Sequence, residues 1–96
     1  MQKTNSYECI IIYSVKNGED ATNALKEKFQ ALIEQNATVD SIDEWGKRRL
    51  AYLINDEPEG FYVLVNFTSP PEFPAELDRV TKITEGVLRS LIIKHE

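Results

Sequence analysis

The sequence predicts an α+β fold, namely a ferredoxin-like split βαβ arrangement: a four-stranded antiparallel sheet with two helices on one face. The hydrophobic periodicities follow the order strand, helix, strand, strand, helix, strand. The first and third strands are apolar on both phases, as central strands are, whereas the second and fourth carry charge, as edges do. Two right-handed crossovers then place both helices on one face, so residues 1–96 are expected to form one domain.

The first strand is predicted over residues 7–15, and the Asn17-Gly18 pair marks a turn after it. Asp20 is a suitable N-cap for the helix that follows, and Asn36 is a suitable left-handed terminator. Between them, apolar residues recur at helical spacing and form one amphipathic stripe: Leu25, Phe29, Leu32 and Ile33.

The second strand is predicted over residues 38–55 and the third over 61–67, with a polar turn at 56–60 joining them into a hairpin. Val39 and Ile42 fall on opposite phases, which indicates a break in register before Trp45. Gly46 within the same run indicates a β-bulge or a close backbone approach.

The last third of the chain contains the second helix and the fourth strand. Pro74 suits a first helical turn, and Leu77, Val80 and Ile83 give a short apolar stripe. The final strand is predicted over residues 87–93. In this fold no helix covers the second face of the sheet, so residues there must contact water or a partner.

Composition places the protein among intracellular domains of modest size. The single cysteine, Cys9, excludes an internal disulfide framework, and the first residues lack the apolar core of a secretory signal. No apolar run approaches membrane-spanning length, so a location in the cytoplasm or in an equivalent organelle interior is expected. The net charge of −5 argues against a general nucleic-acid binder. RNA affinity of the chain alone is expected to be weak, because few phosphates can be neutralised.

Catalysis is not expected. His95 is the only histidine and is the penultimate residue, and the four glycines form no phosphate-binding loop. Cys9 lies in an apolar strand, which favours a buried thiol over an activated one. The carboxylates at 40–44 and 56–59 are typical of a solvated surface, so we expect no metal and no cofactor. An acylphosphatase-like enzyme would need a phosphate-cradling loop with an arginine, and Asn17-Gly18 is too short for one.

Residues 45–54 hold the only tryptophan and the only run of three basic side chains. Leu50, Tyr52 and Ile54 share one phase and are expected on one face of the strand. The three cations, Lys47, Arg48 and Arg49, have two interpretations. They either contact RNA phosphate or charge an exposed edge against self-pairing, and the nearby acidic residues favour the second.

This run resembles the signature of the bacterial small-subunit ribosomal protein S-six family. The matching residues are Gly46, Arg48, Arg49, Leu50, Ala51, Tyr52, Ile54 and Asn55. Further matches lie at Tyr7-Glu8, at residues 76–79 and at residues 87–89. Leu53 stands where the family usually has Pro, and because Leu can donate a backbone hydrogen bond, the strand end is expected to pair differently.

The resemblance implies a structural constituent of the 30S subunit that binds the central domain of small-subunit ribosomal RNA together with ribosomal protein S-eighteen. It implies that the partner protein contacts an edge made of Asp43, Glu44, Trp45, Lys47, Arg48 and Arg49. RNA contact is then expected from dispersed residues: Lys3, Tyr7, Arg79, Arg89 and Lys94.

Two other functions share this topology. A ligand-binding regulatory module on the same fold would pair through its sheet edges and bind a small metabolite. An RNA-recognition motif would stack bases on aromatics of the first and third strands. Residues 59–66 match that motif only in part, since Glu59 stands where a basic residue is required and Val63 where an aromatic is required.

Overall fold

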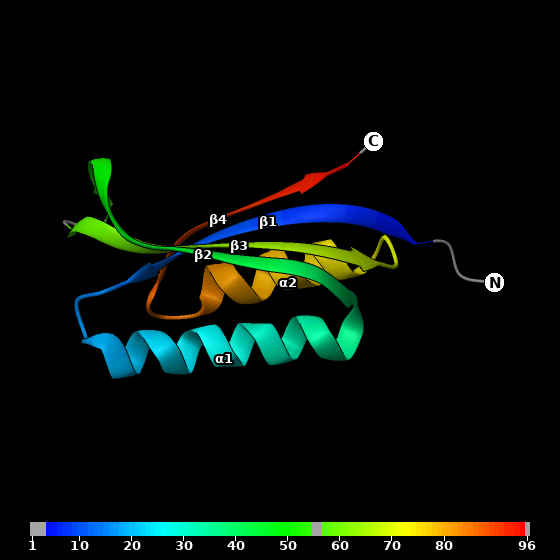
Figure 1. The fold of residues 1–96 in the computed structure, drawn as a ribbon, viewed down its shortest axis with the longest axis horizontal. Helices are drawn as coiled ribbons and strands as arrows, with labels where there is room; N and C mark the ends of the chain where they lie inside the picture. The colour runs from blue at the N-terminus through cyan, green and yellow to red at the C-terminus, as the bar shows by residue number, and fades with distance from the viewer. Residues whose placement is uncertain (1–3, 55–56, 96) are drawn as a thin grey trace.

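The computed structural model describes residues 4–54 and 57–95 and confirms the predicted fold class. The elements are β1 (Asn5–Ser14), α1 (Glu19–Asn36), β2 (Thr38–Ile54), β3 (Glu57–Ser69), α2 (Phe73–Ile83) and β4 (Val87–Lys94). The strands form one antiparallel sheet in the order β2-β3-β1-β4, so β1 and β3 are central as predicted. Both helices lie against the same face of this sheet (Figure 1). No helix in the described part of the chain is long and apolar enough to cross a membrane.

The core lies between the sheet and the two helices. Phe67 of β3 is at its centre, stacked on Tyr7 with 5.6 Å between ring centroids and edge-on to Phe73 at 5.7 Å. Alternate residues of β1 and β3 face the helices and are buried there. The buried cluster comprises Tyr7, Cys9, Ile11, Tyr13, Phe29, Ile33, Val63, Val65, Phe67, Phe73 and Leu77.

The breaks in register that the sequence indicates along β2 are present. The pairing of β2 with β3 shifts between Val39 and Ser41 and again between Glu44 and Gly46. Gly46 has a φ of +82°, a left-handed conformation that favours glycine. The second bulge therefore places Trp45 outside the regular alternation of the strand.

The predicted ends of α1 are wrong in detail. The helix begins at Glu19, Gly18 with a φ of +95° is its N-cap, and no side chain caps it. The hydroxyl of buried Thr22 instead donates to the carbonyl oxygens of Ser14 (3.0 Å) and Gly18 (3.1 Å), which ties the first turn to the end of β1. Asn36 remains helical, and the chain becomes extended directly afterwards.

The predicted turn at 56–60 is also wrong, because β3 already begins at Glu57. Asp56 lies outside the described residues. Gly60 pairs with both Ser14 of β1 and Arg48 of β2, and Glu59 pairs with Arg49. Of these pairings, the one between Glu59 and Arg49 lies beyond the last residue of β1 and lengthens the hairpin. Together the pairings outweigh the weak strand tendency of a Pro-Glu-Gly sequence.

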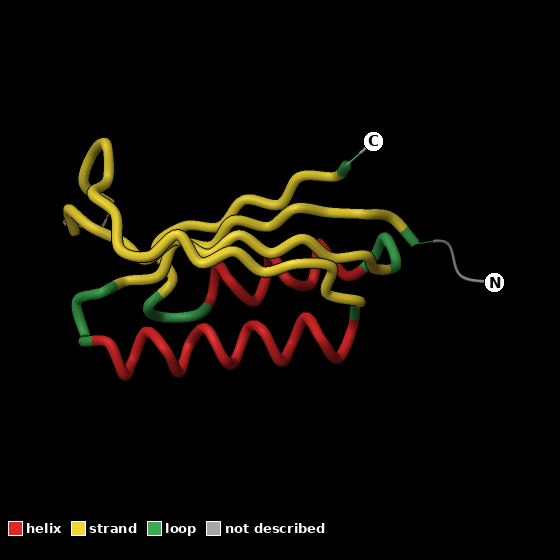
Figure 2. The backbone as a smooth tube through the Cα atoms, in the orientation of Figure 1, coloured by secondary structure: helices red, strands yellow, loops and turns green. Residues whose placement is uncertain are grey.

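The end of the β2–β3 hairpin, residues 48–54 and 57–59, is called the hairpin end below. It bends away from the helices (Figures 1 and 2). The regular pairing stops at Arg49 and resumes at Ile54 with Glu57. Leu50 is 8% exposed but lies outside the helix-covered core, whereas Tyr52 is 65% exposed. Leu50 and Tyr52, predicted to lie on one face of the strand, therefore differ widely in exposure beyond the point where regular pairing stops.

Candidate partner edge and nucleic-acid interface

The face of the sheet that the helices leave open has an apolar centre. Ile10 of β1 pairs with Leu64 of β3 on one side and with Leu91 of β4 on the other. All three alternate with core residues, so they point away from the helices. Leu91 and Ile93 are exposed. Such a surface is suited to contact with another macromolecule.

The six residues of the predicted partner edge are all exposed on the outer strand β2, and the bulge at Trp45 divides them between two faces. Glu44 turns to the helix side, where its carboxylate accepts a hydrogen bond from the Lys26 ammonium at 2.7 Å. Lys47 pairs opposite Phe61 on the same side, with its ammonium 3.7 Å from the Glu59 carboxylate. These charges therefore belong to local ion pairs.

The open-face members of the edge form a small polar and aromatic cluster. The Trp45 indole N–H donates to the Asp43 carboxylate at 3.0 Å. Its ring stacks on Tyr62, with 6.1 Å between centroids and 16° between planes. Tyr62 alternates with the core residues Phe61 and Val63, so this stack lies on the open face. The indole is thereby held in one orientation at the border of the edge.

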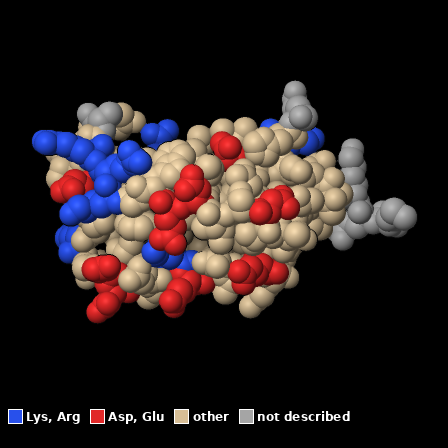
Figure 3. Space-filling view, viewed as in Figure 1, with Lys and Arg blue, Asp and Glu red and all other residues tan. Residues whose placement is uncertain are grey.

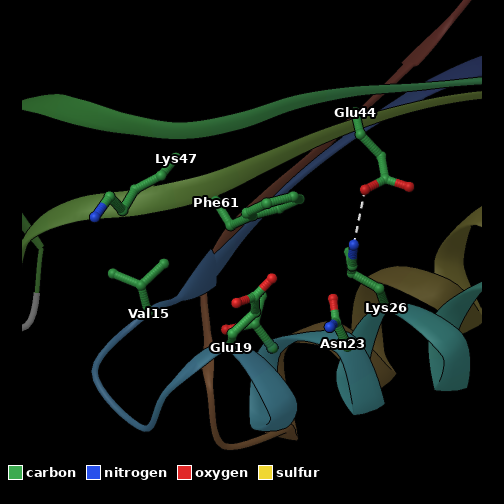
Figure 4. A pocket seen from close by; sticks show the side chains of 8 residues that line it. Val15, Glu19, Asn23, Lys26, Glu44, Lys47 and Phe61 are labelled. Atoms are coloured by element: carbon green, nitrogen blue, oxygen red, sulfur yellow. Dashed lines mark hydrogen bonds and ion pairs between the residues drawn. The ribbon is translucent and has the colours of Figure 1, made fainter.

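A cavity of about 460 Å³ lies on the helix side, between the start of α1 and the strands β2 and β3 (Figure 4). The Lys26 ammonium sits 4.5 Å from the centroid of the Phe61 ring and reaches Glu44 across it. Both lysines of the cavity, Lys26 and Lys47, lie within ion-pair distance of carboxylates. This internal neutralisation does not favour the metabolite-binding alternative. In the described residues no cluster of metal-ligating side chains occurs.

The hairpin end brings together residues from both edges of the sheet. Arg89 of β4 donates from Nη1 to the Tyr52 hydroxyl at 3.0 Å, although 37 residues separate them. Next to this contact, Trp45, Arg48, Arg49 and Tyr62 line an open hollow of about 390 Å³. Lys and Arg side chains gather at this end of the molecule, whereas Asp and Glu spread over its middle and its helix side (Figure 3).

The residues predicted to contact RNA are not brought together. Tyr7 is 7% exposed and stacked in the core, so burial removes its ring from any RNA surface. Arg79 lies on α2 and donates two hydrogen bonds to Glu76, which lowers the pKa of that carboxyl. Lys94 and Arg89 lie at opposite ends of β4, and Lys3 lies outside the described residues. Of the predicted contacts that the structure describes, only Arg89 joins a cluster, and that cluster is the one at the hairpin end.

Comparison with known proteins shows the family. The family model described as ribosomal protein S6 matches residues 6–94. The chain belongs to the ribosomal protein S6 family. In this S6 chain the unusual Leu53 lies exposed near the hairpin end, and β2 continues through it to Ile54.

Relatives of this S6 chain match it over almost its whole length. The small ribosomal subunit protein bS6 of Clostridium perfringens is 52% identical over 91 residues, which cover 94% of this chain and 96% of that protein. The protein of the same name from Alkaliphilus metalliredigens is 48% identical over 90 residues, covering 94% and 96%. The crystal structure of 30S ribosomal protein S6 from Thermotoga maritima superposes with a TM-score of 0.89 at 24% identity, covering 97% of this chain and 89% of that chain, which supports the fold.

Proposed function

We propose that this protein is a structural constituent of the small ribosomal subunit in the bacterial cytoplasm. It binds the central domain of small-subunit ribosomal RNA together with ribosomal protein S-eighteen and performs no catalysis. The coarse part, a subunit constituent, follows from membership of a family whose matched relatives are named small ribosomal subunit protein bS6. The RNA domain and the protein partner are the finer part of the proposal.

One observation carries the finer part: a charged edge strand and an apolar sheet face lie uncovered on the same molecule. β2 is 17 residues long and is an edge strand of the sheet formed by the described residues. Unpaired edges of this kind either are protected by charge or dock a partner. The exposed apolar residues Leu91 and Ile93 lie on β4, the strand at the opposite edge of the sheet. A partner therefore finds both backbone hydrogen-bonding groups and apolar surface.

The charge of the protein explains why RNA and partner act together. With a net charge of −5, the chain neutralises few phosphates by itself. A basic protein seated on the acidic part of the β2 edge would add the missing positive charge. We place that protein on Asp43, Glu44, Trp45, Lys47, Arg48 and Arg49. We place RNA contact on Lys3, Arg79, Arg89 and Lys94.

The test is binding of the purified protein to a central-domain RNA fragment, with and without S-eighteen. We expect weak binding alone and binding at least tenfold tighter with the partner. Asp43→Lys should abolish this gain, because like charges across an interface oppose binding. Glu27→Lys, an identical charge change on the exposed surface of α1, should preserve it. Tight binding by the chain alone, or full cooperativity in Asp43→Lys, would contradict the proposal.

A further inference from the structure

We propose that the hairpin end is a binding site for a single-stranded RNA segment. Arg48 and Arg49, which also belong to the proposed partner edge, contact its phosphates together with Arg89, and Tyr52 stacks on an unpaired base. This inference rests on the proposed function, because it adds a further site to the protein surface that is proposed to contact RNA. It differs from the dispersed set above because it uses residues that the fold itself assembles.

The strand register places the components of this site at one level across the sheet. Gly46, Tyr62, Ile12 and Arg89 are successive partners across the four strands. Neighbouring strands lie ~4.8 Å apart, so this row spans roughly 14–15 Å, the length of two or three nucleotides of an extended strand. Trp45 precedes Gly46 and stacks on Tyr62, so it lies over the same row.

The bend of the hairpin brings Tyr52 to the Arg89 end of this row. The Tyr52 hydroxyl accepts the hydrogen bond of Arg89 at 3.0 Å, which holds one arginine and one aromatic ring side by side. Ile12 in the middle of the row and Leu50 near the bend are each 8% exposed, although no helix covers this face. This burial is what a hairpin end folded over the sheet produces. The ring of Tyr52 itself stays 65% exposed and accessible.

The side chains at this end have the chemistry of a single-strand site. A guanidinium group binds phosphate through two parallel hydrogen bonds and also stacks on bases. Glu59 and Glu57, the carboxylates of the neighbouring β3 segment, engage Lys47 and the Ser14 hydroxyl respectively. Arg48 and Arg49 are exposed beside them, and Lys and Arg side chains gather at this end of the molecule (Figure 3).

An unpaired base is favoured over a duplex as the ligand. Side chains cannot stack on bases within an RNA duplex, whereas exposed aromatics do stack on bases of loops and single strands. Tyr52 presents such a ring next to Arg89, and Trp45 and Tyr62 add two further aromatic rings that line an open hollow together with Arg48 and Arg49.

The experiment measures binding of the free full-length protein to a 12-nucleotide oligouridylate and to a 12-base-pair RNA duplex at low salt. Trp45 is the only tryptophan and lines the hollow, so its fluorescence reports occupancy. Tyr52→Leu should weaken oligouridylate binding about tenfold or more, since stacking contributes this much per base. Tyr52→Phe keeps the ring and should bind within about twofold of the parent.

The arginines are tested by salt dependence. Arg48→Gln with Arg89→Gln should lower the slope of log affinity against log salt by roughly 1.4, because each phosphate contact on a single strand contributes ~0.7. Lys28→Gln with Lys82→Gln makes the same charge change on the helices and should leave the quenching of Trp45 fluorescence intact. Thermal melting of each variant establishes that it is folded.

Three results would overturn the proposal. The first is equal loss of affinity in the arginine and lysine variants, which would indicate a general charge effect. The second is duplex binding as tight as oligouridylate binding. The third is an arginine variant that loses S-eighteen but keeps the oligonucleotide, which would assign the surface to the protein partner. Loss of cooperative ribosomal RNA binding with oligouridylate binding intact would instead contradict only the proposed function.

Discussion

Gly60 provides a direct test of how the hairpin end sits on the sheet. A Cβ atom at this position would lie 2.4 Å from the Ile12 Cγ2 atom and 3.5 Å from both Leu88 Cδ1 and the Tyr13 carbonyl oxygen. Carbon atoms in contact are normally ~3.5–4.0 Å apart, so Gly60→Ala forces an overlap of about 1 Å. Ile12 cannot relieve it cheaply, because its branch methyl is fixed by a stiff χ1 and its side chain is buried.

The expected cost of Gly60→Ala is about 2–3 kcal/mol, at the upper end of the range for overpacked sites. For a domain of this size each kcal/mol lowers the melting temperature by roughly 4–8 °C, so the variant should melt about 8–24 °C below the parent. Urea unfolding followed by circular dichroism gives the free energy directly.

A double-mutant cycle isolates the cause. Ile12→Ala removes the clashing methyl, so the double variant Gly60→Ala with Ile12→Ala should be at least about 1 kcal/mol more stable than the sum of the single effects. Gly46→Ala is the matched control. Gly46 has a positive φ but no atom within 4 Å of an added Cβ, so its cost of about 1–2 kcal/mol should not couple to Ile12. Additive effects at Gly60, or a loss below about 0.5 kcal/mol, would refute the close packing of Ile12 on β3.

Three further predictions follow from buried groups. Leu50→Ala should cost about 2–3 kcal/mol in urea unfolding, because the bent hairpin end buries it, and a loss near zero would mean that this end does not cover the sheet. Thr81→Val should cost about 1–2 kcal/mol, because it removes hydrogen bonds at 2.8 Å to the Asp78 carbonyl and the Ser90 hydroxyl, and Ser90→Ala should then add little. Burial raises the pKa of the Cys9 thiol from 9.0 to about 12. The unfolded chain therefore loses this proton first as pH rises, so this contribution to stability is complete below pH 9 and is lost towards pH 12. Between pH 8 and pH 10 the parent should lose about 1.4 kcal/mol more than Cys9→Ala, and parallel pH profiles of the two proteins would contradict the raised pKa.

Local periodicity was sufficient to predict the architecture. Strands alternate with a period of two and helices with a period of 3.6, so the order of elements can be read from neighbouring residues alone. The two-sided apolar pattern of residues 7–15 and 61–67 also identified the central strands, since β1 and β3 are the two inner strands of the sheet. Gly46 indicated the bulge, since a left-handed backbone position favours glycine.

The ends of the helices and strands were less predictable, because several capping residues and backbone conformations of similar energy compete there. Asp20 is a good capping residue, yet Gly18 is the N-cap and Thr22 anchors the first turn through the carbonyl of Ser14. Residues 57–60 have the composition of a turn, but Glu57 and Glu59 pair with β2, and Gly60 pairs with both β2 and β1, which makes them part of β3. In each case a partner distant in sequence decided between alternatives of similar local energy.

The candidate site, too, was predictable from the sequence in one part and not in another. The charged edge of β2 was identifiable from the sequence, because three adjacent cations stand out in an acidic chain. The family resemblance implied that Tyr7 contacts RNA, although its ring packs on Phe67 in the core. It also assigned Arg89 to a dispersed set, because nothing in the sequence indicates that Tyr52 will lie beside it.

The sequence by itself determined the order of the elements, the apolar faces that make the core and the charged character of the edge. These are properties of residues within a few positions of one another. Only the tertiary structure decided that the hairpin end bends over the open face and joins Tyr52 to Arg89 across the sheet. That arrangement depends on strand register, on the bulge at Trp45 and on the missing side chain of Gly60. Each of these acts between residues far apart in the chain, so no local pattern encodes their combined result.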